Sequence, residues 1–208
     1  MAKIDFFTNP MSRGQIARWA LHEVGAEYDQ HILEYGTTMN APEYLRINPM
    51  GKVPAIVHDG NVVTECAAIC AYLTDTFPDR GLMPTPSERA NYYRWMFFAA
   101  GPVEAAITNH SAGFDPAPEK EMMFGYGSYG RVIDALDGHF NDHDYVCGDR
   151  FTGADLYVGS HVIWGMLFGS MPKRDSLVQY SERLTARPAH MEAKAIDDAL
   201  IAQANPPA

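Results

Sequence analysis

The three cysteines are the side chains of this chain best suited to redox or metal chemistry. Cys66 and Cys70 lie four residues apart, on one face of a helical pattern, and Cys147 lies far from both. There is no CxxC pair, and no histidine or third cysteine stands beside them, so the spacing does not predict a metal site. The pair is typical of small buried residues, and an odd number of thiols without a pairing pattern indicates a reducing compartment.

A serine, Ser12, stands where a hydroxyl can act on an anion. A strand-like segment, Lys3 to Thr8, precedes it, and a helical pattern follows it from Arg13. Serine is a preferred helix cap because its hydroxyl satisfies a free backbone N–H group. A helix N-terminus also attracts negative charge through its free N–H groups and its dipole. A simple cap and an anion contact therefore both remain open for Ser12.

A proline, Pro54, falls inside an otherwise regular β-hairpin. The stretch NPMGKVPAIVHDGNVV is β-prone at Val53–Val57 and has a turn signal at Asp59–Asn61. Proline has no N–H to donate to a sheet, so it belongs at the start of a strand, at an edge or at a bulge. The sequence places Pro54 at the start of the first hairpin strand.

A small α/β unit must position these residues. Apolar spacing predicts a strand at 3–8, a helix at 13–24, a strand at 27–33, a short helix at 39–47, the hairpin, and a helix at about 65–77. The first two strands should be parallel because a helix joins them, whereas the hairpin strands are antiparallel. Residues 1–78 therefore predict an α/β domain with a mixed four-stranded sheet, in the order βαβ, short helix, ββα.

The remainder of the chain is predicted to be helical. Residues 79–87 have the composition of a linker, and residues 88–208 form an all-helical domain. Helices are expected from about 87 to 99, with an interruption at Pro102, and at about 120–141, 152–168 and 176–187. In the stretch FTGADL, Thr152 and Asp155 form a close variant of the capping box, which is a structural signal.

Charge and hydropathy exclude some classes of function. The formal net charge of −10 argues against nucleic acid, whose binding depends on a basic surface. No apolar run approaches the roughly 18 residues that span a bilayer, so no membrane partner is expected. The N-terminal residues enter a strand pattern at once, without the apolar core of a signal peptide, which favours a cytoplasmic location.

Five segments in order resemble the cytosolic glutathione S-transferases, in particular bacterial members, from about Lys3 to Arg187. The segment NPMGKVPAI resembles the part of that family in which a valine precedes a cis-proline, and TECAAICAYL resembles its Glu/Gln-Ser helix start. SRGQIARWALHEVGAEYD is similar to its first helix, and RWMFFAAGPVE and GDRFTGADLYVGS are similar to its helical domain. The resemblance implies a thioredoxin-like N-terminal domain, an all-α C-terminal domain and a homodimer.

The resemblance also implies how the tripeptide glutathione binds, with no metal cofactor. A cis Val53–Pro54 bond, which costs only about 0.5–1 kcal/mol, turns the backbone of Val53 toward the cysteinyl backbone of the ligand. Glu65 is expected to pair with the ligand's ammonium, and the backbone at 65–66, including Cys66, with its γ-glutamyl carboxylate. Lys52 is a candidate for the glycyl carboxylate, although an exposed surface lysine is the alternative.

Ser12 is the expected catalytic residue of this resemblance. Its hydroxyl, with the N–H groups of Arg13 and Gly14, would stabilise the glutathione thiolate. A free thiol has a pKa near 8.5, and a shift of about two units is worth roughly 2.7 kcal/mol. The resemblance also implies a pocket for the electrophile between the domains. Its expected lining residues, which helical spacing alone would assign to a core, are Tyr92, Trp95, Met96, Phe98 and Trp164. His110 is a further candidate, to supply a positive charge or a proton, and a surface histidine is the alternative.

Two departures from the family pattern affect these expectations. Phe6 and Phe7 occupy the end of the first strand, where some classes have a catalytic tyrosine. Cys66 replaces the usual serine, which weakens one expected hydroxyl contact to the ligand. The expected activity is attack by the glutathione thiolate on a small hydrophobic electrophile. The alternatives are a non-catalytic glutathione-binding or regulatory protein, and a glutathione-dependent isomerase or peroxidase.

Overall fold

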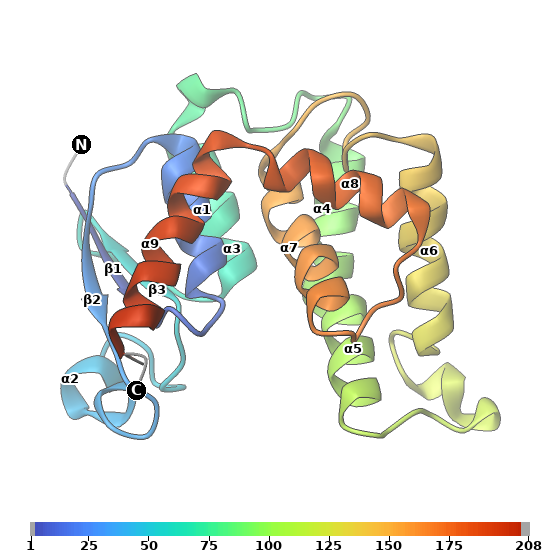
Figure 1. The fold of residues 1–208 in the computed structure, drawn as a ribbon, viewed down its shortest axis with the longest axis horizontal. Helices are drawn as coiled ribbons and strands as arrows, with labels where there is room; N and C mark the ends of the chain where they lie inside the picture. Colours follow the sequence, from blue (N-terminus) through green and yellow to red (C-terminus); the bar gives the residue numbers. More distant parts are fainter. Residues whose placement is uncertain (1–2, 205–208) are drawn as a thin grey trace. The chain divides into compact units, whose positions relative to one another are not determined.

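The computed structural model describes residues 3–204, which form two compact units (Figure 1). The first unit comprises the chain up to Leu82 together with the segment from Ala186 onward, and the second comprises Met83–Thr185. The first unit contains β1 (Ile4–Thr8), α1 (Gly14–Val24), β2 (Tyr28–Ile32), α2 (Pro42–Leu45), β3 (Ala55–His58), β4 (Asn61–Val63), α3 (Cys66–Thr76) and α9 (Pro188–Ala204).

The first unit is built on a mixed four-stranded sheet in the order β2-β1-β3-β4. β1 and β2 are parallel, with Phe6 opposite Gln30, whereas β1 pairs antiparallel with β3, and β3 with β4. The predicted fold class is therefore confirmed, including the parallel first pair and the antiparallel hairpin. The predicted short helix at 39–47 is a single 3₁₀ turn, Thr38–Asn40, followed by α2.

Alternation along β1 supplies a core on each face of the sheet. Phe6 is fully buried and meets the ring of Tyr28 edge-on, at 5.6 Å between ring centroids. Its neighbour Phe7 points the other way, where it packs against a small core of Met39, Tyr44 and Ala55. The second core fixes α2, and with it the loop that leads to Pro54.

Helix α9 is the element that the sequence pattern missed. It is alanine-rich and its buried positions include Asp197, so it has little apolar periodicity. It packs along α1 (Figure 1). By its contacts it belongs to the unit that holds the sheet, whereas the sequence predicts that residues 88–208 form one helical domain. The predicted domains, residues 1–78 and 88–208 with a linker at 79–87, stay a prediction.

The second unit is entirely helical within its described residues. It contains α4 (Arg89–Phe98), α5 (Glu104–Ser111), α6 (Tyr129–Asp142), α7 (Gly153–Leu167) and α8 (Asp175–Thr185). A π-helical turn, Ala99–Val103, separates α4 from α5 and contains Pro102, as predicted. The expected helix start near residue 120 is wrong. Residues 118–123 form a 3₁₀ turn, and Gly127, at φ 67°, ends the irregular segment before α6.

The capping box at the start of α7 is confirmed. The carboxylate of Asp155 accepts hydrogen bonds from the N–H of Thr152 (2.8 Å), the N–H of Val146 (2.8 Å) and the hydroxyl of Tyr180 (2.9 Å). This fully buried carboxylate thus joins α7, α8 and the loop before α7. It is a structural group, as its sequence motif indicated.

An ion pair between Glu88 and Arg150 gives the second unit a specific acid sensitivity. The guanidinium of Arg150 donates to both carboxylate oxygens of Glu88, and the N–H of Thr85 donates to one of them. The hydrogen bonds from Arg150 are the main reason that the pKa of Glu88 falls from 4.5 to about 2. A lowered folded-state pKa means stability that is present above about pH 4.5 and lost as the pH falls toward 2.

Glu88→Gln removes the charge of this pair and is therefore expected to lower the free energy of unfolding at neutral pH. The expected loss is only about 1–2 kcal/mol, because the pair is partly exposed and solvent screens it. The difference from the parent protein should shrink as the pH falls from about 5 to about 2, and urea unfolding across that range measures it. Glu119→Gln, at an exposed glutamate, is the matched control. A difference that does not depend on pH would mean that Glu88 stabilises the unit through packing alone.

Candidate functional site

Ser12 lies in a tight turn between β1 and α1. Its hydroxyl donates to the carbonyl of Asn9 (2.6 Å) and accepts the N–H of Gly14 (2.9 Å). Helix α1 begins at Gly14 with Arg13 in the cap position, so the prediction of Ser12 as the N-cap residue is wrong by one position. The hydroxyl nevertheless satisfies the first N–H of the helix, which is the physical task of a cap.

Side-chain hydrogen bonds and close packing fix this turn. The amide of Asn9 donates to the carbonyl of Leu33 (2.8 Å), and its oxygen accepts the N–H of Met11 (2.9 Å). A Cβ atom at Gly14 would lie 1.9 Å from the hydroxyl oxygen of Thr8, so only glycine allows α1 to begin this close to β1. The Ser12 hydroxyl is therefore held at a defined position beside the start of α1.

The loop before β3 presents an unpaired piece of backbone. The Val53–Pro54 peptide bond is cis, as predicted, and β3 begins at Ala55. The carbonyl of Lys52 accepts hydrogen bonds from the hydroxyl of Tyr44 and from the amide of Asn48 (2.7 Å). Within residues 3–204, the N–H and C=O groups of Val53 have no hydrogen-bond partner. Val53 thus lies at the end of a rigid loop with both backbone groups available.

Glu65 stands at the start of α3 in an unusual backbone conformation. Its φ of 64° and ψ of 117° lie outside the regions that residues with a side chain normally adopt. Such a conformation costs of order 1–3 kcal/mol and is found mainly at functional sites. The carboxylate is exposed, and in the described chain it forms no ion pair, and neither does the exposed ammonium of Lys52.

Cys66 connects the two helix starts. The residue is 7% exposed, and its thiol donates to the carbonyl of Arg13 at 3.6 Å. The neighbouring Cys70 thiol, followed by burial, raises the pKa of Cys66 well above its usual value. A raised pKa favours the protonated thiol, which is a weaker nucleophile than the thiolate. Its contact brings Glu65 and Cys66 of α3 beside the Ser12–Gly14 turn, so the structure brings these predicted residues together.

The residues expected to line an electrophile pocket differ in how far they are exposed. Tyr92, Trp95 and Met96 are only 1%, 2% and 5% exposed and belong to the core of the helical unit, where Trp95 packs against His139. Their place in an acceptor pocket stays a prediction. Phe98 and Trp164 are half-buried.

His110 has an ordered, exposed imidazole. It stacks on the ring of Tyr129 at 4.0 Å between centroids, and its Nδ1 lies 2.9 Å from the carboxylate of Asp115. Burial is the main reason that the pKa of Tyr129 is raised. The three side chains form one polar cluster of the second unit.

The residues that fix the backbone of the site loops by hydrogen bonds were not predicted from the sequence. Tyr44 and Asn48 fix the carbonyl of Lys52, and Asn9 fixes the turn at Ser12. The repeated Asn-Pro pairs, at residues 9–10 and 48–49, were the available signal, because asparagine before a proline favours a turn.

Two negative findings apply to residues 3–204. They contain no group of three or more His, Cys, Asp or Glu side chains arranged to hold a metal ion. None of the helices in this range has both the length and the hydropathy needed to cross a membrane.

Two family models match the chain, and together they span most of it. Residues 2–75 match the glutathione S-transferase N-terminal domain, and residues 106–188 match the glutathione S-transferase C-terminal domain. The first match contains the Ser12 turn, the Val53–Pro54 loop and the start of α3.

Individual proteins show the same similarity. Glutathione S-transferase GstA of Escherichia coli O157:H7 is 27% identical over 173 residues, which is 79% of this chain and 80% of that protein. A glutathione transferase structure from Methylococcus capsulatus has a TM-score of 0.77 at 26% identity, covering 94% of this chain and 99% of its own. A sphingomonad glutathione S-transferase solved with glutathione has a TM-score of 0.76 at 25% identity, covering 93% and 98%.

Proposed function

Because this chain belongs to the glutathione S-transferase family, we propose that it binds glutathione on its first unit and activates the thiol. The thiol loses its proton, and the sulfur then forms a bond to an electrophilic carbon of a small hydrophobic acceptor. The acceptor either releases a leaving group or takes up a proton. Glutathione is a co-substrate here, and no metal takes part.

The observation that carries this proposal is the unpaired backbone of Val53. A buried or half-buried N–H and C=O pair without partners is uncommon, because most such groups are hydrogen-bonded. Together these groups match one residue of an extended peptide, which would pair with them as an added strand does. The cysteinyl residue of glutathione is proposed as that partner. Its sulfur would then be held next to the proline at the start of β3.

The charges of the site fit the two ends of the tripeptide. Glu65 supplies an unpaired carboxylate for the γ-glutamyl ammonium, and the free N–H groups at the start of α3 suit the adjacent carboxylate. Lys52, exposed and unpaired within the described residues, suits the glycyl carboxylate. These contacts bind parts of the ligand that do not change in the reaction, so they contribute to affinity and orientation.

Ser12 is proposed as the thiolate-stabilising residue. Its hydroxyl carries one proton, which the carbonyl of Asn9 accepts. Rotation about the side chain would direct that proton to the sulfur, and the positive end of α1 would add to the effect. Arg13, exposed beside it, is proposed to assist through its backbone N–H.

Three finer points complete the proposal. Phe98 and His110 of the second unit are proposed to contact the acceptor. A homodimer is proposed, and the exposed rings of Tyr93 and Phe97, one turn apart on α4, offer an apolar strip for such contact. A cytoplasmic location is proposed because the three free thiols suit a compartment where glutathione keeps cysteines reduced.

Titration calorimetry with glutathione, beside a panel of acceptors, tests the proposal. A nitro-activated aryl chloride, an isomerisable dienone and a hydroperoxide represent conjugation, isomerisation and peroxide reduction. We expect glutathione binding and turnover of the aryl chloride. Binding without turnover of any acceptor would favour the regulatory alternative, and turnover of only the second or third would favour the other enzyme classes. No binding would end the proposal.

Cys66→Ser is expected to lower the dissociation constant for glutathione roughly two- to tenfold, with little change in kcat. The long contact of the thiol to Arg13 is weak, and a hydroxyl is a better donor for the γ-glutamyl carboxylate. Calorimetry and a melting curve measure the two effects. Cys70→Ser, at a fully buried thiol one turn further along α3, should lower the melting temperature and leave affinity unchanged. A lower melting temperature with unchanged affinity in Cys66→Ser would mean that Cys66 is a core residue and does not contact the ligand.

A further inference from the structure

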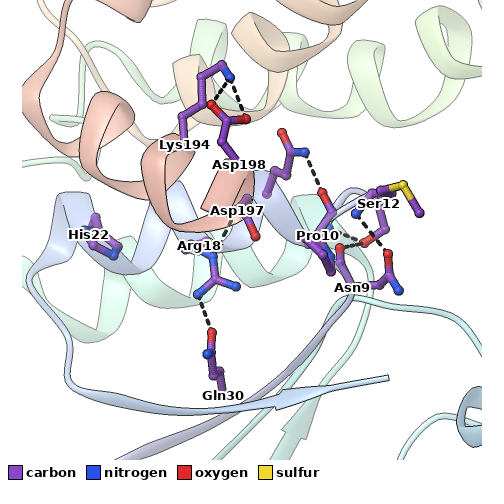
Figure 2. A network of polar contacts seen from close by, with 12 residues as sticks. Asn9, Pro10, Ser12, Arg18, His22, Gln30, Lys194, Asp197 and Asp198 are labelled. Atoms are coloured by element: carbon purple, nitrogen blue, oxygen red, sulfur yellow. Dashed lines mark hydrogen bonds and ion pairs between the residues drawn. The ribbon is translucent and has the colours of Figure 1, made fainter. Parts of the chain in front are cut away.

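A buried ion pair joins α1 to α9. The Nε of Arg18 lies 3.0 Å from the Oδ2 of Asp197, and the two side chains are 0% and 1% exposed. Figure 2 shows Arg18 between Gln30 of β2 and Asp197 of α9, with Ser12 in the turn just before α1, the helix that holds Arg18. The residues are 179 positions apart in the chain, and both belong to the first unit.

Other groups hold the guanidinium in place. Its Nη1 donates to the hydroxyl of Tyr28 (3.0 Å) and to the amide oxygen of Gln30 (2.9 Å), and its carbon lies 5.3 Å from the centroid of the Phe6 ring. The Nη2 of Arg18 and the Oδ1 of Asp197 are buried without a partner in the described chain. The guanidinium is thus fixed in position, although one of its nitrogens has no hydrogen-bond partner in the described chain.

Stability alone is a poor explanation for this pair. Replacing a buried ion pair by apolar residues of similar volume is often neutral or stabilising, because desolvation offsets the attraction between the charges. Two buried polar atoms without partners add to the cost. The position of the pair on α1 suggests a different role.

Arg18 lies close to the place where the thiol is proposed to bind. It is four residues after Gly14, the first residue of α1, which corresponds to about 6 Å along the helix axis. The guanidinium is therefore on the order of 10 Å from a sulfur at the start of α1. Because the pair is buried, solvent and salt screen it far less than they screen a surface charge.

We propose that Arg18 and Asp197 are positioning residues that hold α1 and balance the charge beneath its first turn. This inference rests on the proposed function, because it concerns the thiol bound at that turn. In the paired state the cation and the carboxylate cancel at the distance of the sulfur. Removing either charge would then shift the acidity of the thiol, and the two removals would act in opposite directions.

Other charged groups surround the pair and the thiol position. On α1 and α9, His22 lies 3.2 Å from the hydroxyl of Tyr28 and 3.5 Å from Glu192, and Asp198 pairs with Lys194 at the surface. Arg13 and Glu65 lie at the thiol site itself. Every variant below leaves these groups unchanged, except for the control at Asp198.

The test is the ultraviolet absorbance of bound glutathione thiolate as a function of pH. Asp197→Asn keeps the shape and the hydrogen bond but leaves the cation uncompensated, so the thiol pKa should fall by about half a unit. Arg18→Met leaves the buried carboxylate without its cation, and burial then favours its protonated form, so the thiol pKa should rise by less than this. The double variant Arg18→Met/Asp197→Leu removes both charges and should return the pKa to the parent value.

Two further variants keep the test decisive. Asp198→Asn changes the neighbouring but exposed carboxylate and should leave the thiol pKa unchanged. Gln30→Glu adds a negative charge beside Arg18 at an exposed position, so it should fold even where a buried variant does not, and it should raise the pKa. Arg187, the residue just before α9, donates to both carboxylate oxygens of Glu23 in α1 (2.6 and 2.7 Å), so a second ion pair joins this part of the chain to α1.

The outcomes separate this inference from the proposed function. If the parent protein binds glutathione without lowering its thiol pKa, the proposed function fails first. If the parent lowers the pKa, opposite shifts in Asp197→Asn and Arg18→Met support the inference. Thiol pKa shifts in the same direction in these two variants would overturn the inference. If the two buried variants do not fold, an unchanged thiol pKa in Gln30→Glu would overturn it. In either case the ion pair would have a structural role only.

Discussion

Replacing Ser12 by alanine is expected to raise the pKa of bound glutathione by about one to two units and to lower kcat/KM at neutral pH roughly ten- to a hundredfold. The hydroxyl is the side-chain donor at the start of α1, and losing it leaves the thiolate to backbone N–H groups and the helix dipole. Phe6 and Phe7 offer no substitute hydroxyl at the end of β1. The pH profile of kcat/KM, measured with the aryl chloride, reports the shift.

The same variant also removes the hydrogen bond to the N–H of Gly14, which should cost about 0.5–2 kcal/mol of stability. The pH profile separates the two effects. If only the thiol pKa changes, the rates of Ser12→Ala and the parent converge once the pH exceeds the raised pKa. A deficit that persists at high pH would assign Ser12 to the structure of the turn. Ser12→Thr, which keeps the hydroxyl, should keep most of the activity.

Glu65→Gly is expected to weaken glutathione binding by about ten- to a hundredfold while leaving the fold as stable as before, or more stable by up to about 1 kcal/mol. A charge-assisted hydrogen bond to the ligand's ammonium is lost, and this accounts for the loss of affinity. Glycine removes the steric strain of a side chain at φ 64°, which stabilises the folded state. The greater flexibility of glycine in the unfolded chain offsets part of that stabilisation. Calorimetry and urea unfolding measure the two effects.

Asp59 provides the matched control for Glu65, because it is the other described residue besides glycine with a positive φ (50°). It lies in the hairpin turn rather than at the start of a helix. Asp59→Gly should leave the dissociation constant unchanged. A weaker fold with unchanged affinity in Glu65→Gly would contradict the ligand role of Glu65 and remove the functional reason for its conformation.

The sheet and the site loops were predictable from sequence because local signals fix them. Alternating apolar residues define β1, and the Asp59-Gly60 turn defines the hairpin. The proline at the start of β3 and the acidic residue at the start of α3 lie where the sequence placed them. Glycines and prolines mark these boundaries, and their backbone limits do not depend on distant residues.

The remaining features depend on residues far apart in the chain. Nothing near Arg18 in sequence indicates a partner at Asp197, and a helix whose buried face holds a carboxylate lacks an apolar stripe. Trp95 and Met96 illustrate a different problem: their helical spacing is the same for a core and for a pocket, so the spacing alone did not show that both are buried. The start of α6 was misplaced because the 3₁₀ turn at 118–123 has helix-forming residues without a continuing helix.

The central claim is that this protein binds glutathione and lowers the pKa of its thiol. The most direct test is the ultraviolet titration of the thiolate in the complex, with saturation confirmed by calorimetry at each pH. We predict an apparent pKa about one to two units below the value near 8.5 of a free thiol. A saturated complex whose thiol titrates at the free value would contradict the claim.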